Sequence, residues 1–518
     1  MRIGIDVGGT NTDAVLMDGT TVLAGTKATT TTDVSSGIVR ALEDLREARD
    51  FQPEDVEAVM IGTTHFVNAF VEASRLASVA ALRLGLPATA SLPPMCDWPQ
   101  RLVEAVQGRA YLAHGGHEFD GRHISELDED ELRRHATDMA SHGVEAVAVS
   151  AVFSPVSDEF EVRAAQILRD ELGPDVPISL SSQIGRTGLL GRENATIANA
   201  ALSRMATTVI DGFEASLARY GISAPLFLSQ NDGTLMDAGY ARQYPISTFS
   251  SGPTNSMRGA AVLSGLDSCA VVDIGGTTSD VGVLTHGFPR EANTEVQIGG
   301  VRTNFRMPDV LSVGIGGGSL VTDEGGAVRV GPRSVGYRLR EEALVFGGST
   351  LTATDVVVAA GMADIGDTAA VAHLPKELVQ QALQRIEADV AEALDRMRTS
   401  PEPLAVVAVG GGSVLLPESL PGFDDVIKPE NYAVANAIGA AIAQVGGEVD
   451  QVYKVAPGAR DSVVADAQQA AVDRAVSAGA AAGTVRIVEF DEVPIPYLPG
   501  NATRIRCKAV GDLGQTSA

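Results

Sequence analysis

The sequence of 518 residues is poor in cysteine, aromatic side chains and positive charge. Its three cysteines, Cys96, Cys269 and Cys507, are isolated from one another and include no Cys-x-x-Cys pair. This spacing favours reduced thiols over a disulfide framework and gives no sign of an iron–sulfur site. Lysine and arginine number 39 against 66 aspartates and glutamates, for a formal net charge of −27. Such a charge argues against nucleic acid or an anionic membrane as a partner.

Other features are also missing. No apolar run reaches the roughly 18–20 residues that a transmembrane helix needs. Met1 leads at once into an apolar strand, which leaves no signal peptide, so we expect a cytoplasmic protein. The chain has no Gly-Lys pair, which excludes the Walker A loop, and no G-x-S-x-G elbow. The length and the 45% hydrophobic content predict at least two domains with substantial cores.

What the chain does contain is a glycine pattern close to its N-terminus. Residues 2–7 predict a strand, Gly8-Gly9 a tight turn, and residues 14–17 the returning strand. A tip made of glycine and threonine lets backbone N–H and hydroxyl groups approach a polyanion. The flanking carboxylates of Asp6 and Asp13 suit a hydrated Mg²⁺. Taken alone, the same residues fit an ordinary Gly-Gly hairpin equally well.

The pattern occurs twice, which changes its meaning. Residues 273–280 repeat residues 6–13 with five of eight positions identical, including both aspartates and both glycines. A repeat this far apart indicates two similar halves. A third element, the apolar strand at 404–409 followed by Gly410-Gly411-Gly412, comes after them. These three elements in this order resemble the actin, sugar-kinase and chaperone ATPase superfamily, where two ribonuclease-H-like domains close on ATP.

This resemblance implies an α/β fold of two ribonuclease-H-like (actin/hexokinase-type) domains around an ATP cleft, with an inserted subdomain. We expect an N-terminal domain over residues 1–185, including an insertion at about 77–145. An ATPase-like domain would cover residues 186–455, and a C-terminal helix and strand extension residues 456–518. The polar, glycine-containing connection at 182–192 marks the expected boundary between the halves.

Over nearly its whole length the chain resembles the A-type members of the hydantoinase/oxoprolinase family. Besides the two hairpins, the matching segments are Gly62-Thr63-Thr64 with Asn68-Ala69, Arg192–Thr196 with Asn199-Ala200, Ser251-Gly252-Pro253, and Gly316-Gly317-Gly318-Ser319. That family includes ATP-dependent openers of cyclic amides such as oxoproline and N-methylhydantoin, and also ATP-dependent ketone carboxylases. The resemblance implies an oligomer, a small cyclic amide for substrate and, for partner, a second hydantoinase-type subunit.

The implied chemistry is opening of a cyclic amide by carbonyl phosphorylation. A ring amide is a poor electrophile, and phosphoryl transfer from ATP to its carbonyl oxygen gives an imidate phosphate that water attacks more easily. The transfer depends on positioning and charge neutralisation. On this reading Asp6 and Asp273 act on Mg²⁺ or its waters, while Asp13 or Asp280 orients the attacking water or simply holds its hairpin. The nucleotide contacts would come from Gly8, Gly9, Thr10, Asn11, Gly275, Gly276, Thr277 and Thr278, with Gly410, Gly411 and Gly412 on the adenosine.

The substrate side is assigned to Thr63, Thr64, Asn304 and Arg306, with Asp309 as a further catalytic candidate. The two threonines follow a glycine at the expected start of a helix, where free N–H groups and hydroxyls can face an anion or a carbonyl. An ordinary helix cap explains the same threonines equally well.

Histidines gather in one part of the chain. Six of the eight lie between residues 65 and 142, and His114, His117 and His123 share a turn-like run with Asp120. Imidazoles and a carboxylate this close can bind a second divalent metal such as Zn²⁺ or Mn²⁺. Their spacing matches no standard metal motif, so solvated polar loop residues are the alternative.

Three other functions stay open. A subunit of an ATP-dependent ketone carboxylase would consume bicarbonate and need partner chains. A small-molecule kinase would release a stable phosphorylated compound in place of a ring-opened acid and inorganic phosphate. An ATP-driven activator of the same superfamily would act on a protein, but activators that deliver electrons carry clustered cysteines, which this chain lacks.

Overall fold

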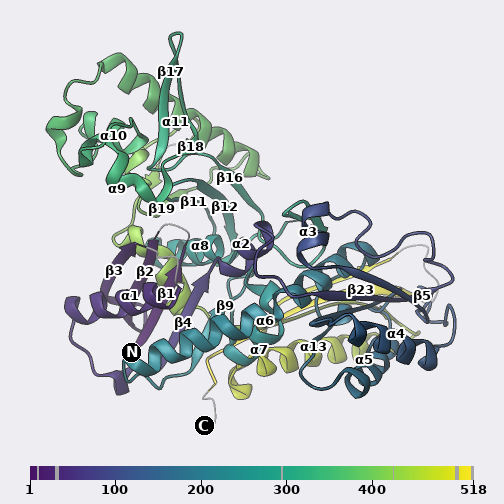
Figure 1. Ribbon diagram of the computed structural model, residues 1–518. Helices are drawn as coiled ribbons and strands as arrows, with labels where there is room; N and C mark the ends of the chain where they lie inside the picture. Colours follow the sequence, from purple (N-terminus) through teal and green to yellow (C-terminus); the bar gives the residue numbers. More distant parts are fainter. Residues whose placement is uncertain (9–10, 30–33, 293–295, 424, 496–500, 515–518) are drawn as a thin grey trace.

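The computed structural model describes residues 1–8, 11–29, 34–292, 296–423, 425–495 and 501–514 (Figure 1). It is a mixed α/β structure built on three main sheets. The largest has the strand order β22-β23-β21-β10-β9-β4-β1-β2-β3. Its strands are β1 (Arg2–Val7), β2 (Asn11–Asp18), β3 (Thr21–Thr29), β4 (Ala58–Thr63), β9 (Leu226–Ser229), β10 (Leu235–Asp237), β21 (Val445–Lys454), β22 (Arg486–Pro494) and β23 (Ala502–Gly511).

The first glycine pattern forms the predicted hairpin in this sheet. Strand β1 pairs antiparallel with β2 and parallel with β4, and the hairpin register sets Asp6 opposite Asp13. Helix α1 (Val34–Ala48) covers the face that carries Ile3 and Ile5, whereas α12 (Ala435–Ile442) covers the other face. Both faces are therefore buried, which explains why every residue of β1 from Ile3 to Val7 is buried.

The second pattern forms an equivalent hairpin in a six-stranded sheet. Its order is β13-β12-β11-β19-β20, with β16 beside β12, and Asp273 lies opposite Asp280. Helix α11 (Lys376–Met397) packs its apolar stripe on one face, and α8 (Ser251–Ser264) packs on the other. The strands are β11 (Cys269–Ile274), β12 (Ser279–Thr285), β13 (Phe288–Pro289), β16 (Val310–Val313), β19 (Val406–Val409) and β20 (Val426–Ile427).

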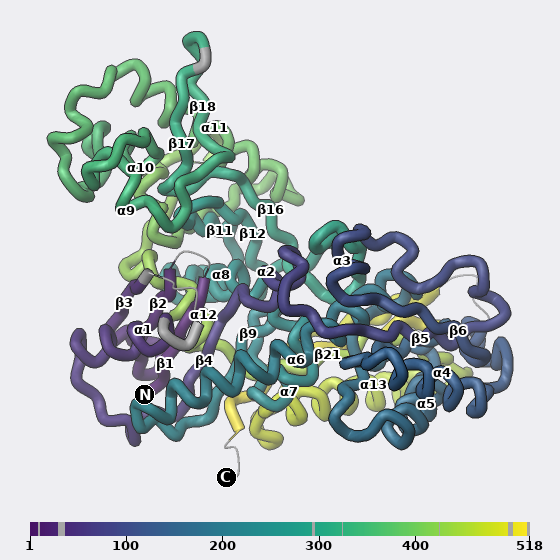
Figure 2. Tube along the Cα trace, viewed as in Figure 1, coloured from purple at the N-terminus to yellow at the C-terminus, as the bar shows by residue number. Residues whose placement is uncertain are grey.

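Helices α8 and α12 cross between the two sheets and join the lobes (Figure 2). They approach so closely that a Cβ on Gly259 would lie 1.9 Å from the carbonyl oxygen of Ala435. A Cβ on Gly439 would lie 1.8 Å from the carbonyl oxygen of Asn255. No side chain fits at either glycine, so this crossing fixes how the lobes meet.

The third sheet, in the order β6-β5-β7-β8, is parallel throughout. Its strands are β5 (Val79–Leu86), β6 (Arg109–His114), β7 (Ala146–Ala151) and β8 (Ile178–Leu180). Helices α4 (Glu129–Ser141) and α5 (Glu159–Leu172) cover one face and the long helix α6 (Leu189–Arg219) covers the other. The inserted unit therefore extends to about residue 180, beyond the insertion expected at 77–145.

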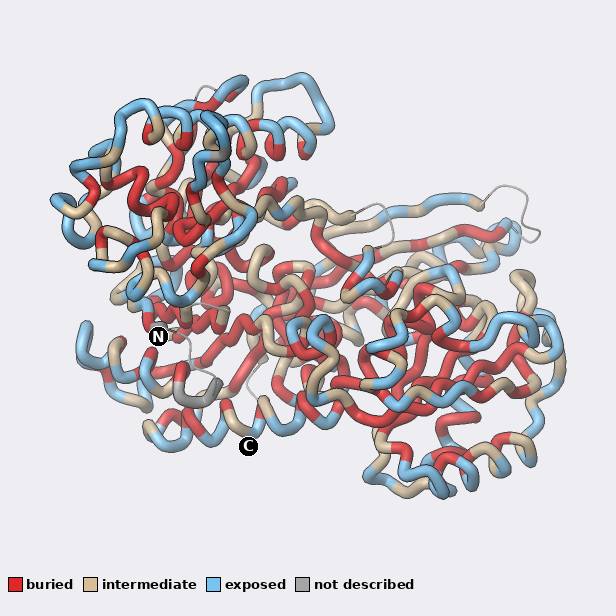
Figure 3. Tube along the Cα trace, turned by 45° about the horizontal axis from the view of Figure 1, so that its top comes forward, coloured by how far each residue is buried: buried red, intermediate tan, exposed pale blue. Residues whose placement is uncertain are grey.

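The C-terminal residues return to the N-terminal lobe. Strand β21 carries the sheet onward from β10, and β23 and β22 complete it, with α13 (Arg460–Ser477) packed against them. Figure 2 shows this yellow C-terminal segment beside the inserted unit. The largest sheet therefore contains strands from all three expected segments, residues 1–185, 186–455 and 456–518. Figure 3 shows buried positions gathered in the interior of the molecule and exposed positions along its edges.

The remaining elements are short and connect or decorate these layers. They are α2 (His65–Val71), α3 (Gln100–Ala105), α7 (Ala238–Gln243), α9 (Leu339–Glu342), α10 (Ala353–Ala359), β14 (Val296–Ile298), β15 (Val301–Thr303), β17 (Ser319–Glu324) and β18 (Ala327–Ser334). Within the described ranges, no helix combines the length and apolarity that crossing a membrane requires.

Candidate active site

Buried carboxylates from both lobes share one electrostatic environment. Burial, and after it the nearby carboxylates of Asp13 and Asp273, raises the pKa of Asp6 to about 7. Burial likewise raises the pKa of Asp273. Since Asp6 belongs to the first hairpin and Asp273 to the second, the two hairpins lie close together where the lobes meet, at the position of the expected cleft.

The crossing helices hold both of these aspartates. Asn436, in the first turn of α12, donates its Nδ2 hydrogen bond to Asp6 Oδ2 at 3.1 Å. Ser256, on α8, donates from its hydroxyl to Asp273 Oδ2 at 2.5 Å. Each carboxylate therefore has one oxygen held by a helix of the crossing that joins the lobes.

Lys27 lies in the same cleft, although the sequence patterns did not indicate it. It is directly opposite Asp13 in the β2–β3 register, and its Nζ lies 2.7 and 2.8 Å from the two carboxylate oxygens. A Cβ on Gly411, from the second lobe, would lie 3.9 Å from the same Nζ. The lysine thus places a positive charge between the lobes. Counting cross-strand partners from the hairpin tip would have found it.

Asp280 is the counterpart of Asp13 in the second lobe. Burial is the main reason that its pKa is raised to about 6; the hydrogen bond from the Ser312 hydroxyl opposes this rise, and the charge of Asp273 adds to it. Ser312 is directly opposite Asp280 in the register of β12 and β16. No cation pairs with Asp280 among the residues that the structure describes.

The two hairpin tips close with the same turn. Gly8 N donates to Asn11 O at 3.0 Å, and Gly275 N donates to Thr278 O at 2.9 Å. In the second tip Gly275, Thr277 and Thr278 are exposed and Gly276 is half-buried, so their polar groups are accessible to a ligand. Two of the candidate contacts in the first tip, Gly9 and Thr10, lie outside the described residues.

The glycine run 410–412 packs against the second hairpin. Gly410 has φ +84°, and a Cβ there would lie 2.3 Å from Asp273 Oδ1. A Cβ on Gly412 would lie 2.5 Å from the Cγ2 atom of Ile274, whereas Gly411 is exposed. Packing alone requires the outer two glycines, and the exposed Gly411 is the one that faces the cleft opposite Lys27.

Thr63 and Thr64 lie beside the first hairpin, at the end of β4. The Thr64 backbone N–H donates to Val7 O at 3.3 Å, which ties the threonines to the strand that carries Asp6. Thr63 Oγ1 lies 2.7 Å from His65 Nδ1. Burial, and then the charge of Arg75, lowers the pKa of His65 to about 4, so this imidazole is neutral at physiological pH. Thr63 Oγ1 accepts a hydrogen bond from the first amide of α2, His65 N, at 3.2 Å, whereas Thr64 makes no side-chain cap bond.

The other candidates have structural contacts away from the hairpins. Asn304 donates to the carbonyl oxygens of residues 186, 187 and 188 at 3.0 to 3.2 Å and so braces the start of α6. Arg306 is buried in ion pairs with Glu291, Glu448 and Glu489. Asp309 pairs with Arg290 at 2.7 Å. Across the described ranges, Asn304, Arg306 and Asp309 form no hydrogen bond or ion pair with either hairpin.

The three histidines of the predicted metal cluster separate into two groups. His117 Nε2 and His123 Nε2 approach the same carboxylate oxygen, Oε1 of Glu159, at 3.3 and 2.9 Å. His114 instead pairs through Nδ1 with Glu131 at 3.0 Å. The ligand atoms of His117, His123 and Glu159 all lie within 4.8 Å of one another, as metal ligands do. Both groups belong to the inserted unit, at the edge where β6 ends.

Comparison with known proteins identifies the family of this chain. The family model for the hydantoinase/oxoprolinase N-terminal region matches residues 2–172, and the hydantoinase/oxoprolinase model matches residues 192–364. The chain is 26% identical over 490 residues to the alpha chain of caprolactamase from Pseudomonas jessenii, covering 88% of this chain and 69% of that protein. It is 28% identical over 396 residues to the acetophenone carboxylase gamma subunit of Aromatoleum aromaticum, covering 69% of this chain and 53% of that protein.

A solved structure shares the whole fold. The crystal structure of the ATP-dependent caprolactamase from Pseudomonas jessenii superposes with a TM-score of 0.79 at 19% identity, covering 99% of this chain and 88% of that one. Identity this low shows the fold alone. The expected α/β architecture, two lobes with matching hairpins and an inserted unit, is confirmed.

Proposed function

Because this chain belongs to the hydantoinase/oxoprolinase family, we propose that it is an ATP-dependent hydrolase that opens a cyclic amide or imide of the hydantoin, oxoproline or lactam type. One observation carries the proposal. Two glycine hairpins from separate lobes bring four buried or half-buried carboxylates to one cleft, together with a single lysine that faces both lobes. Phosphoryl transfer needs such an arrangement, since it depends on positioning and charge neutralisation.

The cleft has the chemistry to hold Mg²⁺ with a nucleotide. Mg²⁺ prefers carboxylate oxygens and water. Asp6 Oδ2 accepts a bond from Asn436 and Asp273 Oδ2 one from Ser256, and a side-chain hydrogen bond from Asn255 also stabilises the charged form of Asp6. The two carboxylates would hold the cation directly or through its waters. Burial raises the pKa of both carboxyl groups, so their charged forms are disfavoured when no cation is bound. A bound cation would stabilise the two carboxylates. Gly62 lies next to the same carboxylate, that of Asp6. A Cβ on this residue would lie 2.4 Å from Asp6 Oδ1, so no side chain fits there.

Each residue then has a role in the reaction. Bound Mg-ATP supplies the phosphoryl group that turns the amide carbonyl oxygen into a leaving group. Exposed N–H groups and hydroxyls of the hairpin tips orient the phosphates, and Lys27 offsets their charge. Asp280, with no cation beside it among the described residues, accepts the proton of the attacking water, while Asp13 holds Lys27 in place. Thr63 and Thr64, beside the first hairpin, position the ring carbonyl.

A second candidate function is a subunit of an ATP-dependent ketone carboxylase. The similarity to the acetophenone carboxylase gamma subunit favours it, because its identity slightly exceeds that to the caprolactamase chain. Both relatives are named as subunits, and the chain spans 69% and 53% of their lengths. We therefore include a second hydantoinase-type subunit, within a larger oligomer, in the proposal.

The decisive experiment measures ADP release by the purified chain with Mg²⁺ across oxoproline, hydantoins and lactams, with and without bicarbonate. Turnover that depends on a cyclic amide and yields an open-chain amino acid with inorganic phosphate supports the hydrolase. Turnover that needs a ketone and bicarbonate transfers the chain to the carboxylases. A stable phosphorylated product would identify a kinase. If ATP binds without turnover, adding the copurifying subunit separates an incomplete enzyme from a protein-directed activator.

The second divalent metal expected from the sequence also stays a proposal. His117, His123 and Glu159 would supply two nitrogens and one oxygen, a set suited to Zn²⁺ or Mn²⁺. His114 is not part of this set. Metal analysis of the protein, compared with a His123→Asn variant and a His142→Asn control on the end of α4, tests it. Equal metal content in all three proteins would contradict the site.

A further inference from the structure

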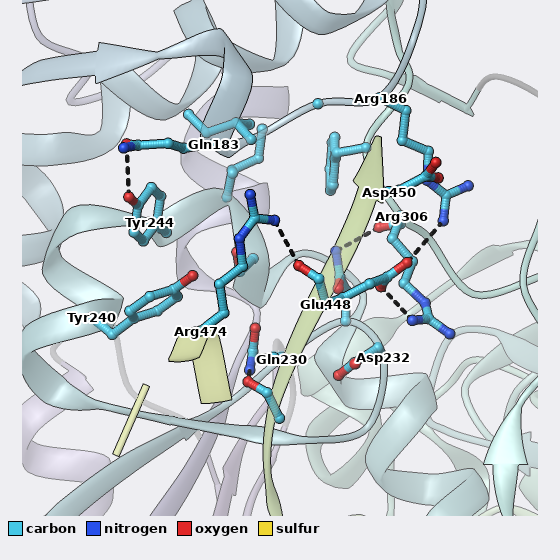
Figure 4. A pocket seen from close by; sticks show the side chains of 18 of the residues that line it. Gln183, Arg186, Gln230, Asp232, Tyr240, Tyr244, Arg306, Glu448, Asp450 and Arg474 are labelled. Carbon is cyan, nitrogen blue, oxygen red and sulfur yellow. Dashed lines mark hydrogen bonds and ion pairs between the residues drawn. The ribbon is translucent and has the colours of Figure 1, made fainter. Parts of the chain in front are cut away.

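A cavity of about 120 Å³ lies beside the inserted unit, away from the hairpin tips (Figure 4). Its wall is formed by the segment before α6, the end of β9, helix α7, strand β21 and helix α13. Three carboxylates and three arginines line it, so its preference for a ligand depends on which of these charges are already paired. None of the roles assigned to the hairpins uses this cavity.

The carboxylates of the cavity are all neutralised by cations. Asp232 pairs with Lys508 at 2.9 Å, and this charge together with Arg306 lowers the pKa of Asp232 in spite of its burial. Arginines likewise lower the pKa of Glu448 against the effect of burial. The pairs are Glu448 with Arg306 and Arg506, and Asp450 with Arg186 and Arg504. These acids therefore have no charge left for a cationic ligand.

Arg474 is the cation without such a partner. In Figure 4 its guanidinium projects into the cavity from α13. Its Nη1 donates to the backbone carbonyl oxygen of Glu448 at 2.6 Å, and within the described ranges it forms no ion pair. A guanidinium carries five donors in a planar fork, so most of its hydrogen-bonding capacity remains. The unpaired charge makes the cavity selective for an anion.

Two residues of the cavity wall also carry hydroxyls that are unused. The Tyr240 hydroxyl, which Figure 4 shows close to Arg474, makes no hydrogen bond with any described residue. Burial raises the pKa of Tyr240, although Arg474 opposes this, so the phenol remains a donor at neutral pH. Ser182 is only 7% exposed, and its hydroxyl also lacks a described partner. The neighbouring Tyr244, by contrast, already donates to Gln183 at 2.9 Å.

The remaining wall is apolar or aromatic. Ile246 and Phe305 line the cavity, and the rings of Tyr240 and Tyr244 pack with their centroids 4.5 Å apart. A ligand would thus meet donors on one side and hydrocarbon on the other, as small-molecule sites usually provide. We propose that this cavity binds a small carboxylate with a ring or short aliphatic body, its carboxylate held by Arg474 and Tyr240.

The cavity connects to the cleft through α8. The backbone carbonyl oxygen of Gln230, in the cavity wall, accepts a hydrogen bond from Thr254 Oγ1 at 3.4 Å. Thr254 lies two residues before Ser256, which holds Asp273. A bound carboxylate therefore contacts the wall that α8 supports. A lactam carboxylate belongs to the proposed ligand class, but the inference does not depend on the proposed reaction, because binding requires no nucleotide.

Calorimetric titration of the full chain without ATP tests the proposal. The probes are oxoproline, cyclopentanecarboxylate and the neutral 2-pyrrolidinone, which lacks the carboxylate. We expect at least one carboxylate to bind about tenfold or more tightly than 2-pyrrolidinone, since a charge-assisted contact is worth more than a neutral one. Binding of neither carboxylate, or equal binding of all three probes, overturns the proposal.

Variants locate the binding to the cavity. Arg474→Gln should weaken carboxylate binding by about tenfold or more and leave 2-pyrrolidinone binding unchanged. Arg460→Gln is the matched control, because Arg460 is an exposed arginine at the start of the same helix. Tyr240→Phe removes one donor and should weaken binding about threefold to tenfold without disturbing the fold. If both cavity variants bind as the wild type does, the carboxylate site is elsewhere and the proposal is wrong.

Discussion

In the first lobe Asp6 faces Asp13 across the hairpin β1–β2, and in the second Asp273 faces Asp280 across β11–β12. A third strand then pairs antiparallel with each hairpin, β3 in the first lobe and β16 in the second. Even the hydrogen bond that closes the turn is the same. The two regions therefore share backbone geometry down to the level of single residue pairs.

The residues on the third strands differ. Lys27 is opposite Asp13, whereas Ser312 is opposite Asp280 at the equivalent position. In the first lobe Asp13 is thus paired with Lys27. In the second lobe Asp280 has no cationic partner among the described residues, and its pKa is about 6. The repeat supplies the geometry of the cleft, and its cross-strand partners divide the chemical roles between the lobes.

The largest expected effect comes from removing the Asp273 carboxylate, whose charge also acts on Asp6 in the other lobe. Asp273→Asn should lower the rate of substrate-dependent ADP release by about a thousandfold or more, because a preorganised charge at the phosphoryl group is lost. Asp6→Asn should be comparable if the lobes contribute equally to Mg²⁺ binding. The exposed Asp267, in the turn before β11, provides an Asp267→Asn control with normal activity. Full activity of Asp273→Asn would refute the shared cleft.

Stability should respond in the opposite direction to activity. The pKa of Asp6 in the folded chain, about 7, is above its ordinary value of 3.8, so the neutral carboxyl stabilises the fold. That stability is fully present below pH 3.8 and is lost as the pH rises through about 7. Asp6→Asn cannot ionise, so at pH 8 without Mg²⁺ it should be more stable than the wild type by about 2–4 kcal/mol.

Unfolding by denaturant at pH 5 and pH 8 measures this effect. Asp280→Asn should stabilise less, because the pKa of Asp280 is raised only to about 6. Asp18→Asn, at the exposed end of β2, should leave the pH dependence unchanged. An Asp6→Asn protein that loses stability with rising pH as the wild type does would show that Asp6 is not the titrating group.

Substitution of Lys27 tests whether this cation only stabilises the first hairpin or also takes part in the reaction. Lys27→Met should lower kcat/KM by about a hundredfold, since one charge-assisted contact to phosphate is lost and Asp13 is left buried without its partner. Lys27→Arg should recover part of the rate. Lys376→Met, on the exposed start of α11, is the control. Only a small loss, about twofold, would mean that Lys27 serves packing alone.

The sequence predicts the two hairpins and their lobes well, because each motif is local and its register follows from a tight turn. It does not predict that β21–β23 continue the N-terminal sheet, since pairing between distant strands leaves no periodic signal. The sequence does not predict that the inserted unit extends past residue 145, because its strand β7 has the same apolar pattern as a strand of either half. Only the pairing of β7 with β5 assigns it to the inserted unit.

The candidate site divides along the same line. Asp6, Asp13, Asp273 and Asp280 come from the motif itself and gather as expected. Arg306, a substrate candidate from the sequence, instead pairs with Glu448 and Glu489, which lie on C-terminal strands whose position no local pattern reveals. Lys27 was missed because a lone lysine at a strand end carries no signal until the register is drawn.

The smallest effect comes from making the second hairpin resemble the first. Ser312 is exposed and donates one hydrogen bond to Asp280, so Ser312→Ala should change the rate by no more than about threefold. Ser312→Lys would set a cation opposite Asp280, as Lys27 is opposite Asp13. That cation should lower the pKa of Asp280 from about 6, and the acid limb of the pH–rate profile should move to lower pH. An unchanged acid limb would exclude Asp280 as the base and would leave the two carboxylates equivalent in chemistry as well as in geometry.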